Sequence, residues 1–418
     1  MLKHVTTGST PQQVWERLLR NEPLFILDVR NRDEFERWRV EGPHPIPTFN
    51  IPYFELLDLE GDEENVTEAV MRGVRAQLME QLPHDRPILA ICAEGNTSNY
   101  VAEGLRRLGF DAVNMEGGME AWGNLYYWRP VEESERFSLF QMVRPARGCL
   151  SHVLMSEHVA AVFDPGRHIE HYRELAAAMG VQIERVLDTH LHADHLSGGP
   201  ALGQGDHIPY HLHPYDAIHP MDMLPARIAY RPLEAEQTFQ VGSAGVRVLH
   251  LPGHTLGMVA FLIEDRYLLS GDSLFLESIA RPDLGGKAEA WTPLLYDSLK
   301  RITGLPDETV VLPAHFSDIA AGDEKGVFHA TLGELKRRNP GLLKLAEGEA
   351  AFSDYILANL PEFPEAYVEI KRANAGLASP DAHKAQELEL GKNICAVGKT
   401  TKEEGEGPQT QRSDSARF

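Results

Sequence analysis

One stretch in the middle of the chain constrains its fold and chemistry more than any other: His190-Leu191-His192-Ala193-Asp194-His195. It follows an apolar segment that we predict to be a buried strand. Three imidazoles and a carboxylate within six residues suit a borderline divalent ion such as zinc or iron. An ordinary polar loop with hydrogen-bonded histidines is the alternative. The density of ligand types and their position after a strand favour a metal site.

Composition and charge exclude several functional classes. With 418 residues, the chain is long enough for two domains and a tail. Its 40 basic and 62 acidic residues give a net charge of -22, which argues against nucleic acid and anionic membrane surfaces as partners. The three cysteines are too few and too widely spaced for a secreted disulfide framework. With no apolar leader or membrane-length run, we expect a cytoplasmic protein, and we expect it to form a homo-oligomer.

The first predicted domain, residues 1–135, presents a cysteine at the end of a strand. Leu24–Val29 and Pro87–Ile91 are continuous apolar runs, typical of strands that are buried on both faces. The second run leads to Cys92, and a helix follows with Ser98 as its expected N-cap. A helix N-terminus stabilises a thiolate, so Cys92 suits a nucleophile that carries sulfur as a persulfide. A small buried packing residue is the alternative.

This domain resembles the rhodanese family. The matching segments are Asp28-Val29-Arg30, Cys92-Ala93-Glu94-Gly95-Asn96-Thr97-Ser98 and Asn114-Met115-Glu116-Gly117-Gly118-Met119-Glu120-Ala121-Trp122. The resemblance implies an α/β domain that transfers sulfur, with Cys92 as the persulfide carrier. It places Arg30, Gly95, Asn96, Thr97 and Ser98 at the loop around that cysteine.

Two features of this loop depart from related patterns. Ser98 stands where the related phosphatases need arginine, so phosphate-ester chemistry is not expected. Glu94 makes the loop acidic, which disfavours a dianion such as thiosulfate. The sulfur donor therefore remains open, and a degenerate domain is an alternative.

In the second predicted domain, residues 136–380, four predicted strands each end just before a residue type that can bind a metal ion. A predicted strand ends before the His190 loop, and three others end before His254, Asp272 and His315. Each of the last three would be a weak signal alone. Because loops at one edge of a sheet scaffold commonly build sites, the four together indicate a shared metal centre.

This arrangement resembles the metallo-β-lactamase superfamily, which implies an αββα sandwich with metal at one edge. In a two-metal member, one site takes His190, His192 and His254, the other takes Asp194, His195 and His315, and Asp272 bridges them. All seven residues are present, so a dizinc hydrolase such as glyoxalase II is one interpretation.

Within the superfamily, the local segments are most similar to the persulfide dioxygenases. These segments are 189–195, 252–255, 271–275, 280–284 and the predicted closing helix at 367–376. The similarity implies one Fe(II) per chain on His190, His254 and Asp272, a two-histidine, one-carboxylate set with open positions. The remaining four residues of the seven would orient the ligands and bound water. Arg281 would face the charge of the thiol carrier, although a surface ion pair is the alternative.

The implied reaction is oxidation of a thiol persulfide, glutathione persulfide for instance, by O2 to sulfite and thiol. A sulfurtransferase domain exchanges persulfide, sulfite and thiosulfate, so this fusion makes more sense beside a dioxygenase than beside a thioesterase. A regulatory sulfur-binding protein with a structural metal is a third hypothesis, disfavoured because closed zinc sites are commonly thiolate-rich.

We interpret the C-terminal stretch and the two other cysteines as structural features. Residues 381–418 are polar, which predicts a disordered tail containing Cys395 as an incidental exposed thiol. Cys149, beside the first strand of the second domain, is interpreted as a packing residue.

Overall fold

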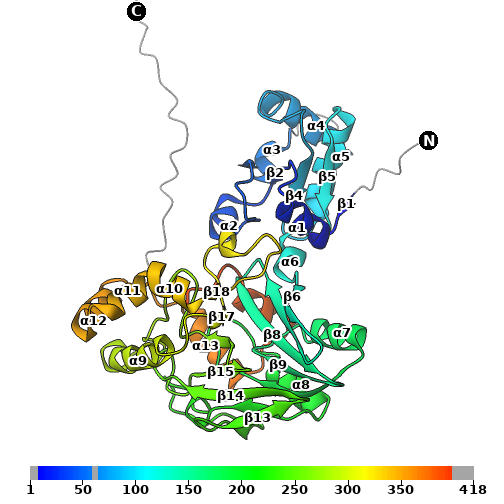
Figure 1. Cartoon of the computed structure of the whole chain (residues 1–418). Helices are drawn as coiled ribbons and strands as arrows, with labels where there is room; N and C mark the ends of the chain where they lie inside the picture. Colours follow the sequence, from blue (N-terminus) through cyan, green and yellow to red (C-terminus); the bar gives the residue numbers. More distant parts are fainter. Residues whose placement is uncertain (1–7, 59–64, 398–418) are drawn as a thin grey trace, which may run out of the picture.

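The computed structural model describes residues 8–58 and 65–397, which form two α/β domains in succession (Figure 1). Among these residues, no helix is both long and apolar enough to cross a membrane. The elements of the first domain are β1 (Gly8–Ser9), α1 (Pro11–Leu19), β2 (Phe25–Asp28), α2 (Arg32–Arg37), β3 (Thr48–Asn50), α3 (Tyr53–Leu56), α4 (Val66–Gln77), β4 (Ile88–Ile91), α5 (Asn96–Arg107), β5 (Ala112–Met115) and α6 (Gly118–Gly123).

The first domain is a parallel sheet covered by helices on both faces. Its strand order is β1-β5-β4-β2-β3. Alternate residues of the central strands face opposite sides: Leu89 packs in one cluster with Trp15 of α1, whereas Ala90 packs in another with Val101 of α5. Burial on both sides explains why β2 and β4 are continuously apolar, as predicted.

The second domain contains two sheets. Its strands are β6 (Tyr127–Glu133), β7 (Ser138–Arg144), β8 (Cys149–Ser156), β9 (Val159–Phe163), β10 (Gln182–Leu187), β11 (Tyr210–Leu212), β12 (Arg231–Pro232), β13 (Thr238–Val241), β14 (Ala244–His250), β15 (Val259–Ile263), β16 (Tyr267–Gly271), β17 (Val310–Pro313) and β18 (Ala330–Thr331). Its helices are α7 (Glu170–Met179), α8 (Gly199–Gly205), α9 (Ala288–Thr303), α10 (Leu332–Arg338), α11 (Pro340–Ala346), α12 (Glu349–Ala358), α13 (Ala366–Asn374) and α14 (Ala382–Leu388).

These sheets pack face to face with helices outside them, which confirms the predicted αββα sandwich. One sheet runs β12-β11-β10-β9-β8-β7-β6 and the other β13-β14-β15-β16-β17-β18. Between them, the rings of Phe163 and Phe261 lie 4.9 Å apart at the centre of a buried cluster. Outside, Tyr172 of α7 packs on the first sheet and Leu295 of α9 packs on the second.

The two domains share a continuous apolar core. Trp15, Trp38 and Trp122 of the first domain belong to the same buried cluster as Leu150 of the second. The Trp38 indole N–H also donates to the Ala146 carbonyl over 2.9 Å. A shared core of this kind fixes the first domain against the sandwich.

The predicted domain boundary at residue 135 is wrong by about one strand. Strand β6 pairs antiparallel with β7, in a register that places Tyr127 opposite Val143, and so belongs to the sandwich. The first domain therefore ends after α6. The error arose because β6 carries partly exposed polar residues and lacks the apolar run that marks the other strands.

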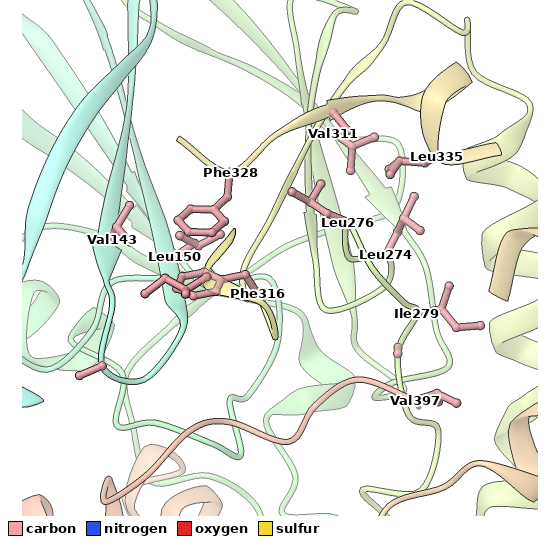
Figure 2. Packing of buried hydrophobic residues seen from close by; sticks show 14 of the residues in the cluster. Val143, Leu150, Leu274, Leu276, Ile279, Val311, Phe316, Phe328, Leu335 and Val397 are labelled. Atoms are coloured by element: carbon pink, nitrogen blue, oxygen red, sulfur yellow. The ribbon is translucent and has the colours of Figure 1, made fainter. Parts of the chain in front are cut away.

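The predicted disordered tail is also wrong for residues 381–397. Helix α14 is followed by a segment that packs into the core, where the Val397 N–H donates to the Ile279 carbonyl over 2.8 Å. Figure 2 shows Val397 beside Ile279 at the margin of the cluster that includes the stacked rings of Phe316 and Phe328. Residues 398–418, the remainder of the predicted tail, lie outside the described residues.

Candidate metal centre

The structure brings the predicted ligand types together at one edge of the sandwich. The His190 loop follows β10, and His254, Asp272 and His315 follow β14, β16 and β17. All seven side chains are buried to within a few per cent of full burial. Since Asp272 and His315 follow strands that pair in parallel, their side chains emerge side by side.

Three buried atoms converge without a hydrogen-bond partner: Nε2 of His190, Nε2 of His254 and Oδ2 of Asp272. The Asp272 Oδ2 atom lies 3.8 Å from the His190 Nε2 and 3.4 Å from the His254 Nε2. These three residues form a group whose ligand atoms all lie within 4.8 Å of one another. Buried polar atoms are normally satisfied, so this convergence fits a divalent ion bound by two imidazoles and one carboxylate.

Hydrogen bonds orient each of these three groups. The His254 Nδ1 donates to the Arg281 carbonyl over 2.9 Å, and the His190 Nδ1 lies 3.0 Å from the Thr189 hydroxyl. That hydroxyl donates to Asp164, so it accepts from His190. Both rings therefore direct an Nε2 lone pair inward, which is the tautomer a metal ligand requires.

The other four predicted residues bond mainly to their neighbours. Asp194 lies between two histidines, with Oδ2 2.8 Å from the His315 Nε2 and Oδ1 3.2 Å from the His195 Nδ1. His192 directs its Nε2 toward Asp164 over 3.1 Å, and its Nδ1 has no hydrogen bond. These groups are adjacent to the converging triad, but they are arranged as ion-paired neighbours of it.

Electrostatics in the centre follow from burial and from this pairing. Burial lowers the pKa of His190 and of His254, which favours the neutral rings that bind metals. Burial alone would lower the pKa of His315. The carboxylates of Asp194 and Asp272 outweigh burial and raise that pKa well above its ordinary value. The His315 Nδ1 lies 2.6 Å from the Asp272 Oδ1, so that ring holds the carboxylate and leaves Oδ2 facing inward.

Sequence reasoning missed the groups that hold the His190 loop from the C-terminal side. The Asn374 amide, at the end of α13, donates to the carbonyls of His192 and His195. Glu389, just after α14, accepts from the Leu196 N–H over 2.8 Å. An asparagine at the end of the predicted closing helix was visible in the sequence, but nothing local indicated its partner.

Both cysteines of the second domain were misplaced by sequence reasoning. Cys149 is not only a packing residue, because its Sγ lies 3.6 Å from the Asp194 Oδ2 and belongs to a group with His195 and His315. Cys395 was predicted to be exposed in a tail, yet it is fully buried and lies 3.6 Å from the Tyr367 hydroxyl. The packed segment that follows α14 brings Cys395 next to the metal centre, in a group with Asp194, Asp272 and His315.

The structure contradicts the prediction that Arg281 faces a substrate. Its guanidinium is buried and forms an ion pair with Asp283 over 2.6 Å. It also donates to the carbonyls of Pro361, Glu362 and Ile394. Arg281 therefore joins loops beneath the metal centre.

A second candidate site surrounds Cys92 in the first domain. The Cys92 Sγ accepts hydrogen bonds from the Gly95 N–H and the Ser98 hydroxyl, each over 3.1 Å. Burial alone would raise the pKa of the thiol. Hydrogen bonds from Ser98, from Thr97 and from backbone N–H groups outweigh burial and lower that pKa below its ordinary value. The loop therefore stabilises a thiolate.

The loop differs in detail from its prediction. The helix N-cap is Gly95, with φ at +83°, and Ser98 lies in the first turn, where its hydroxyl also contacts Asn114 over 2.6 Å. Arg30 does not reach the cysteine, because its guanidinium pairs with Asp28 over 2.7 Å. Asn96 bonds outward to Glu94.

Comparison with protein families assigns both domains. Residues 10–125 match the rhodanese-like domain, and residues 144–315 match the metallo-beta-lactamase superfamily. The chain joins a rhodanese-like domain to a metallo-beta-lactamase domain. The superfamily binds metal ions, and the converging side chains described above lie in the metallo-beta-lactamase domain.

The chain spans about half the length, or less, of the two curated relatives described next. A beta-lactamase hydrolase-like protein of Xylella fastidiosa is 34% identical over 40% of this chain and 40% of that protein. A hydroxyacylglutathione hydrolase of Methylococcus capsulatus is 34% identical over 34% of this chain and 52% of its own length. Among solved structures, a metallo-beta-lactamase of Staphylococcus aureus matches at 25% identity with a TM-score of 0.50, over 57% of this chain and 72% of that one.

Proposed function

We propose that the metallo-beta-lactamase domain is a persulfide dioxygenase and that the rhodanese-like domain is a sulfurtransferase. The observation that carries the proposal is the convergence of three buried ligand atoms, from His190, His254 and Asp272, none of which has a hydrogen-bond partner. That arrangement suits one metal ion held by three protein ligands, with coordination positions left open for O2 and for a substrate sulfur.

One Fe(II) per chain fits this donor set, and when bound it would supply the redox chemistry by which O2 oxidises the terminal sulfur of a persulfide. In the overall reaction, a persulfide anion, O2 and water give a thiol, sulfite and a proton. His190 and His254 act as neutral ligands whose tautomers are set by Thr189 and by the Arg281 carbonyl. His315 holds Asp272 in position, and burial of all these groups keeps bulk water away.

Cys92 is the proposed sulfur carrier of the rhodanese-like domain. Its lowered pKa makes the thiolate available to accept a sulfur atom, and the surrounding donors would equally stabilise a persulfide anion. The two activities would then exchange persulfide, sulfite and thiosulfate in one compartment. Three free cysteines agree with a cytoplasmic location for this chemistry.

A dizinc thioesterase is the second candidate. It is favoured by the complete set of seven ligand types and by the similarity to a hydroxyacylglutathione hydrolase. In that case Asp194, His195 and His315, whose ligand atoms lie within 4.8 Å of one another, would hold the second ion.

The deciding experiment combines metal analysis of protein purified without oxygen with oxygen-electrode traces after adding, in separate runs, glutathione persulfide and N-acetylcysteamine persulfide. About one iron per chain with persulfide-dependent oxygen uptake would support the dioxygenase. Two zinc ions per chain, no oxygen uptake and turnover of a glutathione thioester would overturn it in favour of the hydrolase.

A further inference from the structure

A pocket is lined in part by the loops that carry two of the proposed metal ligands. It has a volume of about 150 Å³, and its lining includes Leu191 and Thr255, the residues that follow His190 and His254 in the chain. The pocket therefore adjoins the loops that hold two of the three converging ligands.

The lining of this pocket is mostly apolar. The apolar side chains come from the His190 loop, from the segment after β11 and from α9, and include Leu191, Ile218, Met223, Leu256 and Trp291. Several are unusually exposed for large apolar residues: Met223 is 67% exposed and Ile218 is 41% exposed. Exposed apolar surface that continues into a pocket is typical of a ligand site.

One buried cation, Lys371 of α13, lines the inner part of the pocket. Only 4% of the residue is exposed, and no hydrogen bond or ion pair of its ammonium is found among the described residues. Asp216 also lines the pocket, but its oxygens already accept from the Leu191 N–H, the Thr255 hydroxyl and the Gly257 N–H. An ammonium that lines a pocket, is largely removed from water and has no direct partner in the described chain suits an anionic ligand.

The position of Lys371 relates this charge to the metal centre. Burial lowers the pKa of Lys371, and the carboxylates of Asp216 and Asp272 act against that shift. An anion held by Lys371 would lie in the pocket that residues of the His190 and His254 loops also line.

We propose that this pocket binds an organic persulfide whose carrier has an apolar arm, and that Lys371 pairs with the ionised terminal sulfur. This inference rests on the proposed function and names its substrate class. The apolar wall receives the carrier. Lys287 is the other lysine of the lining and is exposed at the mouth, so the walls offer no buried partner for the two carboxylates of glutathione.

Anaerobic titration calorimetry on the iron-loaded full chain tests this inference, because without O2 the persulfide binds but is not oxidised. The probes are the persulfides of N-acetylcysteamine, which has a short uncharged arm, and of glutathione. We expect Lys371→Met to bind N-acetylcysteamine persulfide about 10- to 100-fold more weakly than wild type, the effect of losing a charge-assisted contact in a buried site. Lys371→Arg, which keeps the charge, should recover part of the loss. Lys384→Met on the neighbouring α14 is the exposed control.

The outcomes separate this inference from the proposed function. Unchanged binding by Lys371→Met, with an iron content equal to wild type, would overturn the role of Lys371. Glutathione persulfide binding as tightly as N-acetylcysteamine persulfide would overturn the apolar carrier. Normal persulfide binding with no oxygen uptake once air is admitted would instead overturn the dioxygenase and leave the binding site standing.

Discussion

Glu389 offers the sharpest test of how the C-terminal segment supports the metal centre. Its buried carboxylate accepts from Arg144 over 2.8 Å, from Arg167 over 2.7 Å and from the Leu196 N–H over 2.8 Å. Burial alone would raise the pKa of Glu389. The arginines and the Leu196 N–H outweigh burial and lower that pKa to about 2, from an ordinary value of 4.5.

The contribution of Glu389 to stability follows from the difference between these two pKa values. A pKa lowered from 4.5 to about 2 corresponds to about 3 kcal/mol of stability at neutral pH. Because the folded pKa is the lower one, this stability is fully present above about pH 5 and is lost as the pH falls toward 2. We expect Glu389→Gln to destabilise the domain by about 3 kcal/mol at pH 7, since Arg144 then stays buried without its charge partner.

Hydrogen exchange of the backbone in residues 190–197 is the appropriate assay, because it reports the free energy of opening of the loop that Glu389 holds. In Glu389→Gln this opening should become easier at pH 7, and the acid-dependent part of the stability should disappear. Glu387→Gln, two residues earlier in the last turn of α14 and with a 55% exposed side chain, is the matched control. A change within about 0.5 kcal/mol for Glu389→Gln, no larger than an ordinary surface substitution, would refute the reasoning.

Three further predictions concern the two sites directly. His254→Ala should lose bound iron and persulfide-dependent oxygen uptake while keeping sulfurtransfer; metal analysis showing full iron content would remove this residue from the ligand set. Cys92→Ser should abolish sulfurtransfer and leave oxygen uptake with supplied persulfide nearly intact, and loss of both activities would contradict two independent sites. Ser98→Ala should raise the pKa of Cys92 because the thiolate loses a hydrogen bond. The pH profile of iodoacetamide alkylation at Cys92, followed by mass spectrometry, should shift upward accordingly, and an unchanged profile would show that Ser98 does not hold the thiolate.

The sequence by itself determined the scaffold and the position of the candidate ligands along it. Buried strands such as β4 and β16 are short, mainly apolar runs, and Cys92 and Asp272 follow them directly, so both signals are local. A residue that directly follows a strand lies at the edge of the sheet, and this position depends on the local sequence rather than on distant segments. That is why a shared metal centre could be predicted from the strand ends, whereas the choice of His190, His254 and Asp272 within it came from the family resemblance.

Only the tertiary structure decided what surrounds those ligands. Cys395 and Glu389 lie in a stretch whose polar composition resembles a tail, yet long-range packing buries both beside the His190 loop. For Arg281 the sequence left a substrate contact and an ion pair as alternatives, and burial beside Asp283 and three carbonyls decided for the ion pair. Local patterns predict which elements form. The partner of a buried charge depends on segments far away in sequence, whose meeting is determined by the packing of the whole core.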